Sequence, residues 1–172
     1  MKKTTFFILF ALAVLFSSCG NQRQLAVNMQ RAARLSQQMG FTVHPKENLF
    51  LYEEVVPWLG TPYRSGGTTR QGVDCSGFVM AVYENLYGHT TNRTVAAIYE
   101  KDVKNVRKRK LQAGDLLFFN FTTRKNTLSH VGIFLKKGYF IHASTSKGVT
   151  ISHLSDSYYR KGWKKSGKIE LK

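Results

Sequence analysis

The stretch Val73-Asp74-Cys75-Ser76-Gly77-Phe78 decides how this chain folds. Apolar residues recur behind it at helical spacing, so the sequence predicts a helix from Cys75 to about Tyr87, with Gly88 at its C-terminal stop. Asp74 stands where a carboxylate can cap the first turn. The unpaired N–H groups of a helix N-terminus favour a thiolate over a thiol, so the position predicts a reactive sulfur.

The cysteine count supports a nucleophile at this position. The chain has two cysteines, Cys19 and Cys75, and Cys19 lies in the N-terminal leader. An unpaired thiol in an exported protein is unusual for structure and ordinary for catalysis. One alternative is a disulfide between Cys19 and Cys75. The other is a zinc site, but the sequence has no close-spaced pair of Cys or His ligands that would support it.

The N-terminus has the pattern of an export signal. Lys2 and Lys3 precede an unbroken apolar run from Phe6 to Phe16, which is short for a bilayer span and has the size of a signal-peptide core. Small residues then lead to Cys19, as in the lipobox of bacterial lipoproteins. We expect a signal peptide over residues 1–18 and a lipid on Cys19; an ordinary signal peptide or a single membrane anchor is the alternative.

The composition indicates one folded domain with a strongly basic surface. The 172 residues are 42% hydrophobic and carry a formal charge of +16, of which +14 remains once Lys2 and Lys3 are removed. Arg107-Lys108-Arg109-Lys110 has the appearance of a nucleic-acid patch. Export argues against nucleic acid, and the basic surface then suits polyanions of the cell envelope or serves only solubility.

The pattern along the chain predicts an α+β fold. Residues 19–48 form a polar spacer, with one amphipathic helical face at Leu25, Met29, Ala32 and Met39, and residues 49–172 form the domain. Helices are expected first, over 49–59, 75–87 and 94–101. Strands are expected afterwards, over 115–120, 130–135, 139–143, 149–153 and 165–171, which favours an antiparallel sheet.

Two histidines can share one face of this sheet. If Lys136-Lys137-Gly138 is a three-residue loop, Leu135 pairs with Tyr139 and Gly132 faces His142. His130 is then the diagonal neighbour of His142, whereas a two-residue loop would put the two rings on opposite faces. His130 could take the thiol proton, and His142 could orient the His130 ring. His44 and His89 are interpreted as surface residues, and His153 as a bystander, with a place in the lining of a cleft as the alternative.

Five blocks occur in the order seen in the NlpC/P60 family of cell-wall cysteine peptidases, and the chain resembles that family from about Leu49 to Leu171. The blocks are Tyr63-Arg64-Ser65-Gly66-Gly67, Asp74-Cys75-Ser76-Gly77-Phe78, Gly114-Asp115-Leu116, Ser129-His130-Val131-Gly132-Ile133 and Phe140-Ile141-His142-Ala143-Ser144. The resemblance implies a papain-like fold in which N-terminal helices pack on an antiparallel sheet.

The resemblance also implies roles for single residues. Cys75 is the expected nucleophile, His130 the general base and His142 the orienting third member. Tyr63 is expected to stabilise the oxyanion together with the backbone N–H of Cys75. Asp74 and Ser76 match positions near the amino group of the substrate, and Arg93 matches a position of structural role. Neither a metal nor an organic cofactor is expected.

The expected activity is hydrolysis of amide bonds in peptidoglycan stem peptides by a lipid-anchored enzyme that faces the periplasm from the outer membrane. Two other classes remain open at this point. One is a non-catalytic lipoprotein that binds or scaffolds the cell envelope, and the other is a related thiol amidase or acyltransferase. The sequence specifies neither the bond that is cut nor the oligomeric state.

Overall fold

The computed structural model describes the backbone of residues 2–171 and the side chains of residues 21–171. Two compact units divide the chain, the first ending at Leu49 and the second beginning at Phe50. The first unit contains α1 (Lys2–Met39), one continuous helix that includes the short helix expected in the spacer. The side chain of Cys19, and with it the lipidation site, lies outside the described side chains. No helix in the described part of the chain is both long and apolar enough to cross a membrane.

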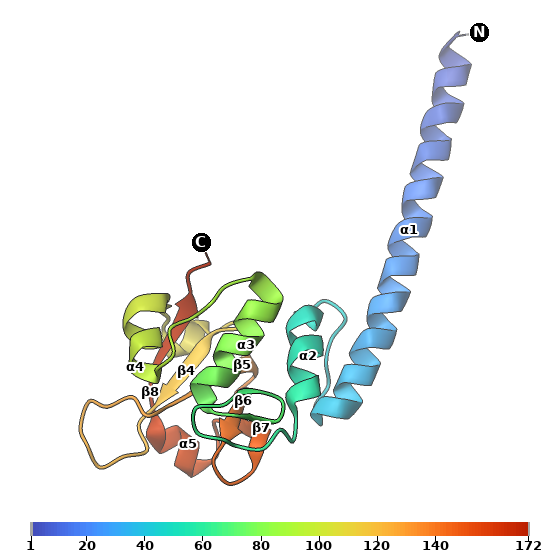
Figure 1. Cartoon of the computed structure of the whole chain (residues 1–172). Helices are drawn as coiled ribbons and strands as arrows, with labels where there is room; N and C mark the ends of the chain where they lie inside the picture. The colour runs from blue at the N-terminus through green and yellow to red at the C-terminus, as the bar shows by residue number, and fades with distance from the viewer. Residues whose placement is uncertain (1, 172) are drawn as a thin grey trace. The chain divides into compact units, whose positions relative to one another are not determined.

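In the second unit most helical elements precede the long strands of the sheet, as predicted, but one helix lies between the last two strands of the chain (Figure 1). Its helical elements are α2 (Leu49–Val55), η1 (Val56–Trp58), α3 (Cys75–Tyr87), α4 (Val95–Ala97), η2 (Ile98–Asp102), η3 (Lys108–Lys110) and α5 (Ser157–Gly162). Its strands are β1 (Thr68–Thr69), β2 (Gly72–Val73), β3 (Val103–Asn105), β4 (Leu116–Phe119), β5 (His130–Lys136), β6 (Tyr139–Ser144), β7 (Gly148–His153) and β8 (Trp163–Ile169). The short pair β1–β2, the strand β3 and the helix α5 were not predicted.

The central sheet has six strands in the order β3-β8-β4-β5-β6-β7, and all neighbours are antiparallel. Its middle strand β4 is buried on both faces, since all four of its side chains are fully buried. Leu117 and Phe119 join Phe134 and Phe140 in an apolar cluster, against which Tyr159 of α5 packs. Alternation along the strand turns Leu116 and Phe118 to the other face. The helix α3 packs on β5 and β6.

The turn between β5 and β6 is not the predicted three-residue loop. Lys136 pairs with Tyr139, so the loop has two residues, Lys137 and Gly138, and both have positive φ, as a type I′ turn requires. The predicted Leu135–Tyr139 pair is therefore wrong. A register shift between Phe134 and Lys136 adds one residue to β5, so Ile133 still pairs with Ile141. The bulge undoes the change of face that the shorter loop would cause.

Gly132 faces His142, as predicted, and packs closely against its strand. Continuing the register from the Ile133–Ile141 pair sets Gly132 opposite His142. A Cβ atom on Gly132 would lie 3.0 Å from the carbonyl oxygen of Ile141 and 3.1 Å from the Cβ atom of His142. Any side chain there would crowd the strand that carries His142, so glycine keeps that histidine in its place.

Candidate active site

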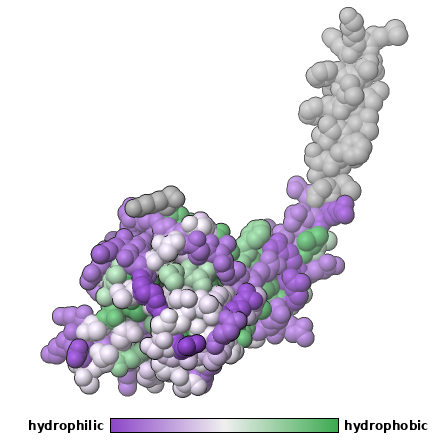
Figure 2. Space-filling view, viewed as in Figure 1, coloured by the Kyte–Doolittle hydropathy of each residue, from purple (hydrophilic) through white to green (hydrophobic). Residues whose placement is uncertain are grey.

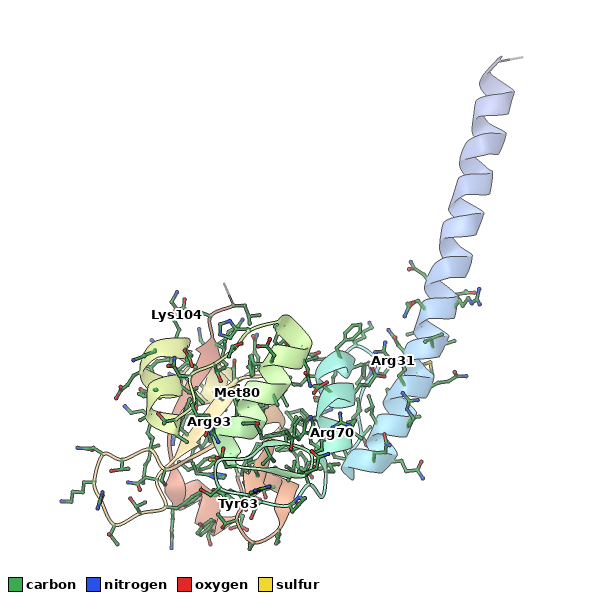
Figure 3. All side chains as sticks on the ribbon, viewed as in Figure 1. Arg31, Tyr63, Arg70, Met80, Arg93 and Lys104 are labelled. Carbon is green, nitrogen blue, oxygen red and sulfur yellow. The ribbon has the colours of Figure 1, made fainter. Side chains whose placement is uncertain are left out.

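The carboxylate of Asp74 organises the start of α3. As the N-cap residue it accepts a hydrogen bond from the backbone N–H of Gly77 at 2.7 Å, as predicted. It also accepts one from the backbone N–H of Gly66 at 2.8 Å, which ties the preceding loop to the helix. The guanidinium of Arg93 completes the arrangement, donating to both carboxylate oxygens at 2.9 and 2.6 Å (Figure 3 labels Arg93).

Ser76 belongs to the same network. Its hydroxyl donates to Asp74 at 3.2 Å and accepts from Arg93 at 2.8 Å. Burial acts to raise the pKa of Asp74, but the hydrogen bonds from Arg93, Gly77 and Gly66 outweigh it, and the pKa is lowered. Asp74 is thus an ionised residue whose oxygens are nearly saturated by the protein, which accounts for its placement at the helix start without any ligand.

The thiol of Cys75 is buried at the first position of α3 and forms no disulfide within the described residues. Backbone N–H groups of Val131, Ser76 and Cys75 itself lower its pKa, but burial dominates and the pKa is raised overall. The helix N-terminus therefore acts in the expected direction without producing the expected thiolate. The Val131 contact sets the sulfur beside the first residues of β5, directly after His130.

His130 and His142 come together as the sheet register requires. The Nε2 atom of His130 lies 2.8 Å from the Nδ1 atom of His142, and the two rings are perpendicular with centroids 4.9 Å apart. His130 is 9% exposed and His142 is 2% exposed. Phe119 and Phe121 pack against the His130 ring, and Phe140 and Tyr159 against that of His142. The aromatic shell holds both rings in one orientation.

A third residue, Ser152 of β7, extends this chain of contacts. Its hydroxyl lies 3.1 Å from the Nε2 atom of His142. If Nδ1 of His130 is to accept a proton, Nε2 of His130 must carry its hydrogen and donate to Nδ1 of His142. His142 then carries its hydrogen on Nε2 and donates it to Ser152. The sequence analysis missed Ser152, because only the observed pairing of β6 with β7 brings it diagonal to His142.

Burial keeps both imidazoles neutral. Desolvation lowers the pKa of His130 to about 4. Desolvation, and then the charges of His130 and Lys147, lower the pKa of His142 to about 3. Together with the raised pKa of Cys75, this leaves a neutral thiol beside two neutral rings at pH 7. No charge is therefore separated among these three side chains in the interior before a proton moves.

Tyr63 reaches the same region from the loop before β1. Its backbone forms an isolated bridge with Val73, two residues before Cys75. Burial raises the pKa of its phenol, and the charges of Cys75 and Asp74 act in the same direction (Figure 3 labels Tyr63). The phenol is therefore a neutral hydrogen-bond donor in the electrostatic range of the sulfur, as an oxyanion contact must be.

The remaining histidines stay outside this group. The ring of His153 lies 2.8 Å from the carbonyl oxygen of Lys137 and 2.7 Å from the hydroxyl of Ser155, so it braces the β5–β6 turn. Across the described residues, no three His, Cys, Asp or Glu side chains are grouped to hold a metal ion.

The family model described as NlpC/P60 family matches residues 60–168, which include every residue of this site. The chain belongs to the NlpC/P60 family. The six-stranded sheet with a cysteine at the start of its packed helix is thus the expected NlpC/P60 architecture, and the predicted α+β class is confirmed.

Several proteins that carry a functional name resemble this chain in sequence or structure. A Haemophilus influenzae protein named as a probable endopeptidase NlpC homolog is 40% identical over 65% of this chain, and the match covers 57% of that relative's own length. The Escherichia coli protein named murein DD-endopeptidase MepS/murein LD-carboxypeptidase is 30% identical, with 92% of this chain and 88% of the relative covered. A solved NLP/P60-family structure from Staphylococcus aureus superposes with a TM-score of 0.61 at 29% identity, over 69% of this chain and 40% of the other.

The low histidine pKa values predict a loss of stability in mild acid. In the unfolded chain both histidines have a pKa of about 6.5, whereas in the folded protein the pKa is about 4 for His130 and about 3 for His142. The unfolded state therefore binds more protons as the pH falls from 7 to 5, and the free energy of unfolding drops by about 2 kcal/mol for each histidine. Urea unfolding at the two pH values measures this, and His142→Asn, which has no titrating ring, should show a smaller drop. An unfolding free energy that is equal at pH 7 and pH 5 would contradict the assignment.

Proposed function

We propose that this chain is a cysteine peptidase that hydrolyses amide bonds in peptidoglycan stem peptides. The observation that carries the proposal is the continuous chain of contacts from His130 through His142 to Ser152, beside the helix that presents Cys75. Family membership and the murein endopeptidase names of its relatives supply the substrate class. The geometry of the site and the family membership together support a hydrolase of the cell envelope.

The chemistry follows from the polarity of this chain of contacts. The thiol proton of Cys75 passes to Nδ1 of His130 as the sulfur attacks the scissile carbonyl carbon. The developing oxyanion takes hydrogen bonds from the Tyr63 phenol and the backbone N–H of Cys75. Collapse breaks the C–N bond while His130 returns the proton to the leaving amine. Water then attacks the thioester carbonyl and gives a proton to His130; the C–S bond breaks, the acid product leaves, and His130 returns the proton to the Cys75 sulfur.

Each histidine has a distinct part in these steps. Because His130 is neutral at pH 7, it can accept the thiol proton. The imidazolium that results donates a hydrogen bond to Nδ1 of His142, which stabilises its positive charge. His142 is a positioning residue, and Ser152 positions His142 in turn. Hydrogen bonds among Asp74, Ser76 and Arg93 hold the start of α3 in place. Arg93 remains partly exposed at the edge of the site, where it can contact the substrate.

A non-catalytic cell-envelope binding protein is the second candidate. The observation in its favour is the raised pKa of Cys75, which leaves the sulfur protonated before substrate arrives. The two candidates differ in whether the thiol is needed at all, which a single substitution decides.

We expect Cys75→Ala to abolish digestion of purified peptidoglycan, because the acyl-enzyme of the proposed mechanism forms on the Cys75 sulfur. The full-length protein in detergent and its Cys75→Ala variant are compared by the release of soluble muropeptides, followed by mass spectrometry. The loss should be at least about a thousandfold. Equal digestion by both proteins would refute the peptidase, and no digestion by either would favour the binding protein.

Ser152→Ala should lower kcat/KM by up to about tenfold, since it removes one neutral hydrogen bond that selects the tautomer of His142. It should also change the pH profile of kcat/KM, because His142 no longer has a fixed acceptor for its Nε2 hydrogen. Ser152→Thr keeps a hydroxyl and should restore both. If the alanine and threonine variants behave alike, the hydroxyl has no part in positioning.

For the N-terminus we propose a signal peptide over residues 1–18, a lipid on Cys19 and a spacer to residue 48 that tethers a catalytic domain of residues 49–172 to the outer membrane, facing the periplasm. The pattern of small residues before Cys19 supports this. A single acyl chain gives only marginal binding, so stable anchoring needs more than one chain on this cysteine.

Cys19→Ala should therefore move the protein from the membrane fraction to the soluble fraction of expressing bacteria and remove a fatty-acid mass from the mature N-terminus. Intact-mass measurement and fractionation follow the change, with Cys75→Ala as the matched control that keeps the lipid. An unmodified Cys19 in the mature protein would rule out the anchor.

A further inference from the structure

A cavity of about 750 Å³ lies between the β4–β5 loop, the helical turn that carries Tyr99, and β8. It is lined by Ala96 and Tyr99, by the loop from Thr122 to Leu128, and by Lys164 and Lys165. A volume of this size accommodates a ligand as large as a short peptide segment. None of the steps assigned above uses it.

Two segments that line the cavity also carry residues that contact the catalytic group. Phe121 stands between two lining residues, Asn120 and Thr122, and its ring packs against His130 with centroids 5.7 Å apart. Ala96, another lining residue, follows three residues after Arg93, whose guanidinium binds Asp74, the cap of the Cys75 helix. The segments that line the cavity thus continue into residues that contact the catalytic group.

The lining is rich in cations that have no partner. Within the described part of the chain, the side chains of Arg124, Lys125 and Lys165 have no carboxylate within ion-pair distance. By contrast, Lys104 of β3, which does not line the cavity, forms an ion pair with Glu170, the residue after β8. Glu100 is the single acidic residue of the lining, so the cavity carries a net positive charge.

The loop that carries two of these cations is held in shape by its own hydrogen bonds. The side chain of Asn120 donates to the carbonyl oxygen of Arg124 at 2.8 Å and accepts from the backbone N–H of Thr122 at 2.8 Å. The hydroxyl of Ser129 accepts from the backbone N–H of Phe121 at 2.9 Å, which closes the loop at its far end. A preformed loop loses less entropy when it binds a ligand than a loose one does.

We propose that this cavity is a substrate subsite that binds the carboxylate groups of a peptidoglycan stem peptide beyond the bond that is cut. This inference rests on the proposed function. Arg124, Lys125 and Lys165 are the ionic contacts, with an arginine fork suited to a carboxylate. The hydroxyls of Thr123 and Thr127 and the amide of Asn126 supply neutral donors. The cavity then selects for substrates that keep their free acids.

A general attraction of the basic chain for an acidic polymer would also weaken when cations are removed, so the test needs a charge-matched control. The exposed Arg109 and Lys110 of η3 provide one, because they do not line the cavity and make the same change in net charge. On the face shown in Figure 2, hydrophilic side chains are widespread, which makes this comparison necessary.

The experiment compares R124Q/K125Q with R109Q/K110Q, both in the full-length chain in detergent. The substrates are a purified free-acid muropeptide and the same muropeptide with amidated carboxylates. For the free acid we expect KM to rise about tenfold in R124Q/K125Q and less than twofold in R109Q/K110Q. For the amidated substrate the wild type and R124Q/K125Q should be alike. Equal effects of the two double variants, or an equal loss on both substrates, would overturn the subsite.

A binding measurement separates this inference from the proposed function. Equilibrium binding of the free-acid muropeptide to the Cys75→Ala protein, with and without R124Q/K125Q, requires no cleavage. A tenfold weaker Kd in the combined variant supports the subsite even if the chain proves to be a non-catalytic binder. An unchanged Kd refutes the subsite and leaves the peptidase standing.

Discussion

The carboxylate of Asp74 is the constraint on which the rest of the site depends. One buried anion holds the first turn of α3, the loop at Gly66 and the guanidinium of Arg93 at the same time. These three segments come from different parts of the chain, and the reactive sulfur is the next residue along. Because the hydrogen bonds are made to an ionised group, each is stronger than a neutral bond, and the position of the sulfur is correspondingly well defined.

Electrostatics explain why the centre is neutral at rest. Burial raises the pKa of Cys75 and lowers those of His130 and His142, so an ion pair of thiolate and imidazolium is not the ground state. The backbone N–H groups around the sulfur still point at the place where negative charge develops. Their contribution is therefore made during the reaction, when the proton moves and the sulfur attacks, which is where stabilisation raises the rate.

Much of this arrangement could be predicted from the sequence, because it depends on local patterns. The cap at Asp74, the helix from Cys75 to Tyr87 and the five later strands all follow from spacing and turn residues over a few positions. The roles of Cys75, His130 and His142 remain predictions. The short strand β3 and the helix α5 were missed, since neither has an apolar period long enough to stand out. Ser152 and the cavity-lining cations depend on tertiary pairing, which no local pattern encodes, and burial reversed the expected pKa of Cys75 for the same reason.

The hairpin that carries both histidines combines a two-residue turn with one extra residue in β5. Each feature by itself would turn the two imidazoles to opposite sides of the sheet, and only their combination keeps them together. The arrangement thus obeys a parity rule. A change in the length of this hairpin by an even number of residues, or an odd change compensated within it, keeps the two rings on one face. An uncompensated single insertion between His130 and His142 separates the two rings while leaving the strands able to pair.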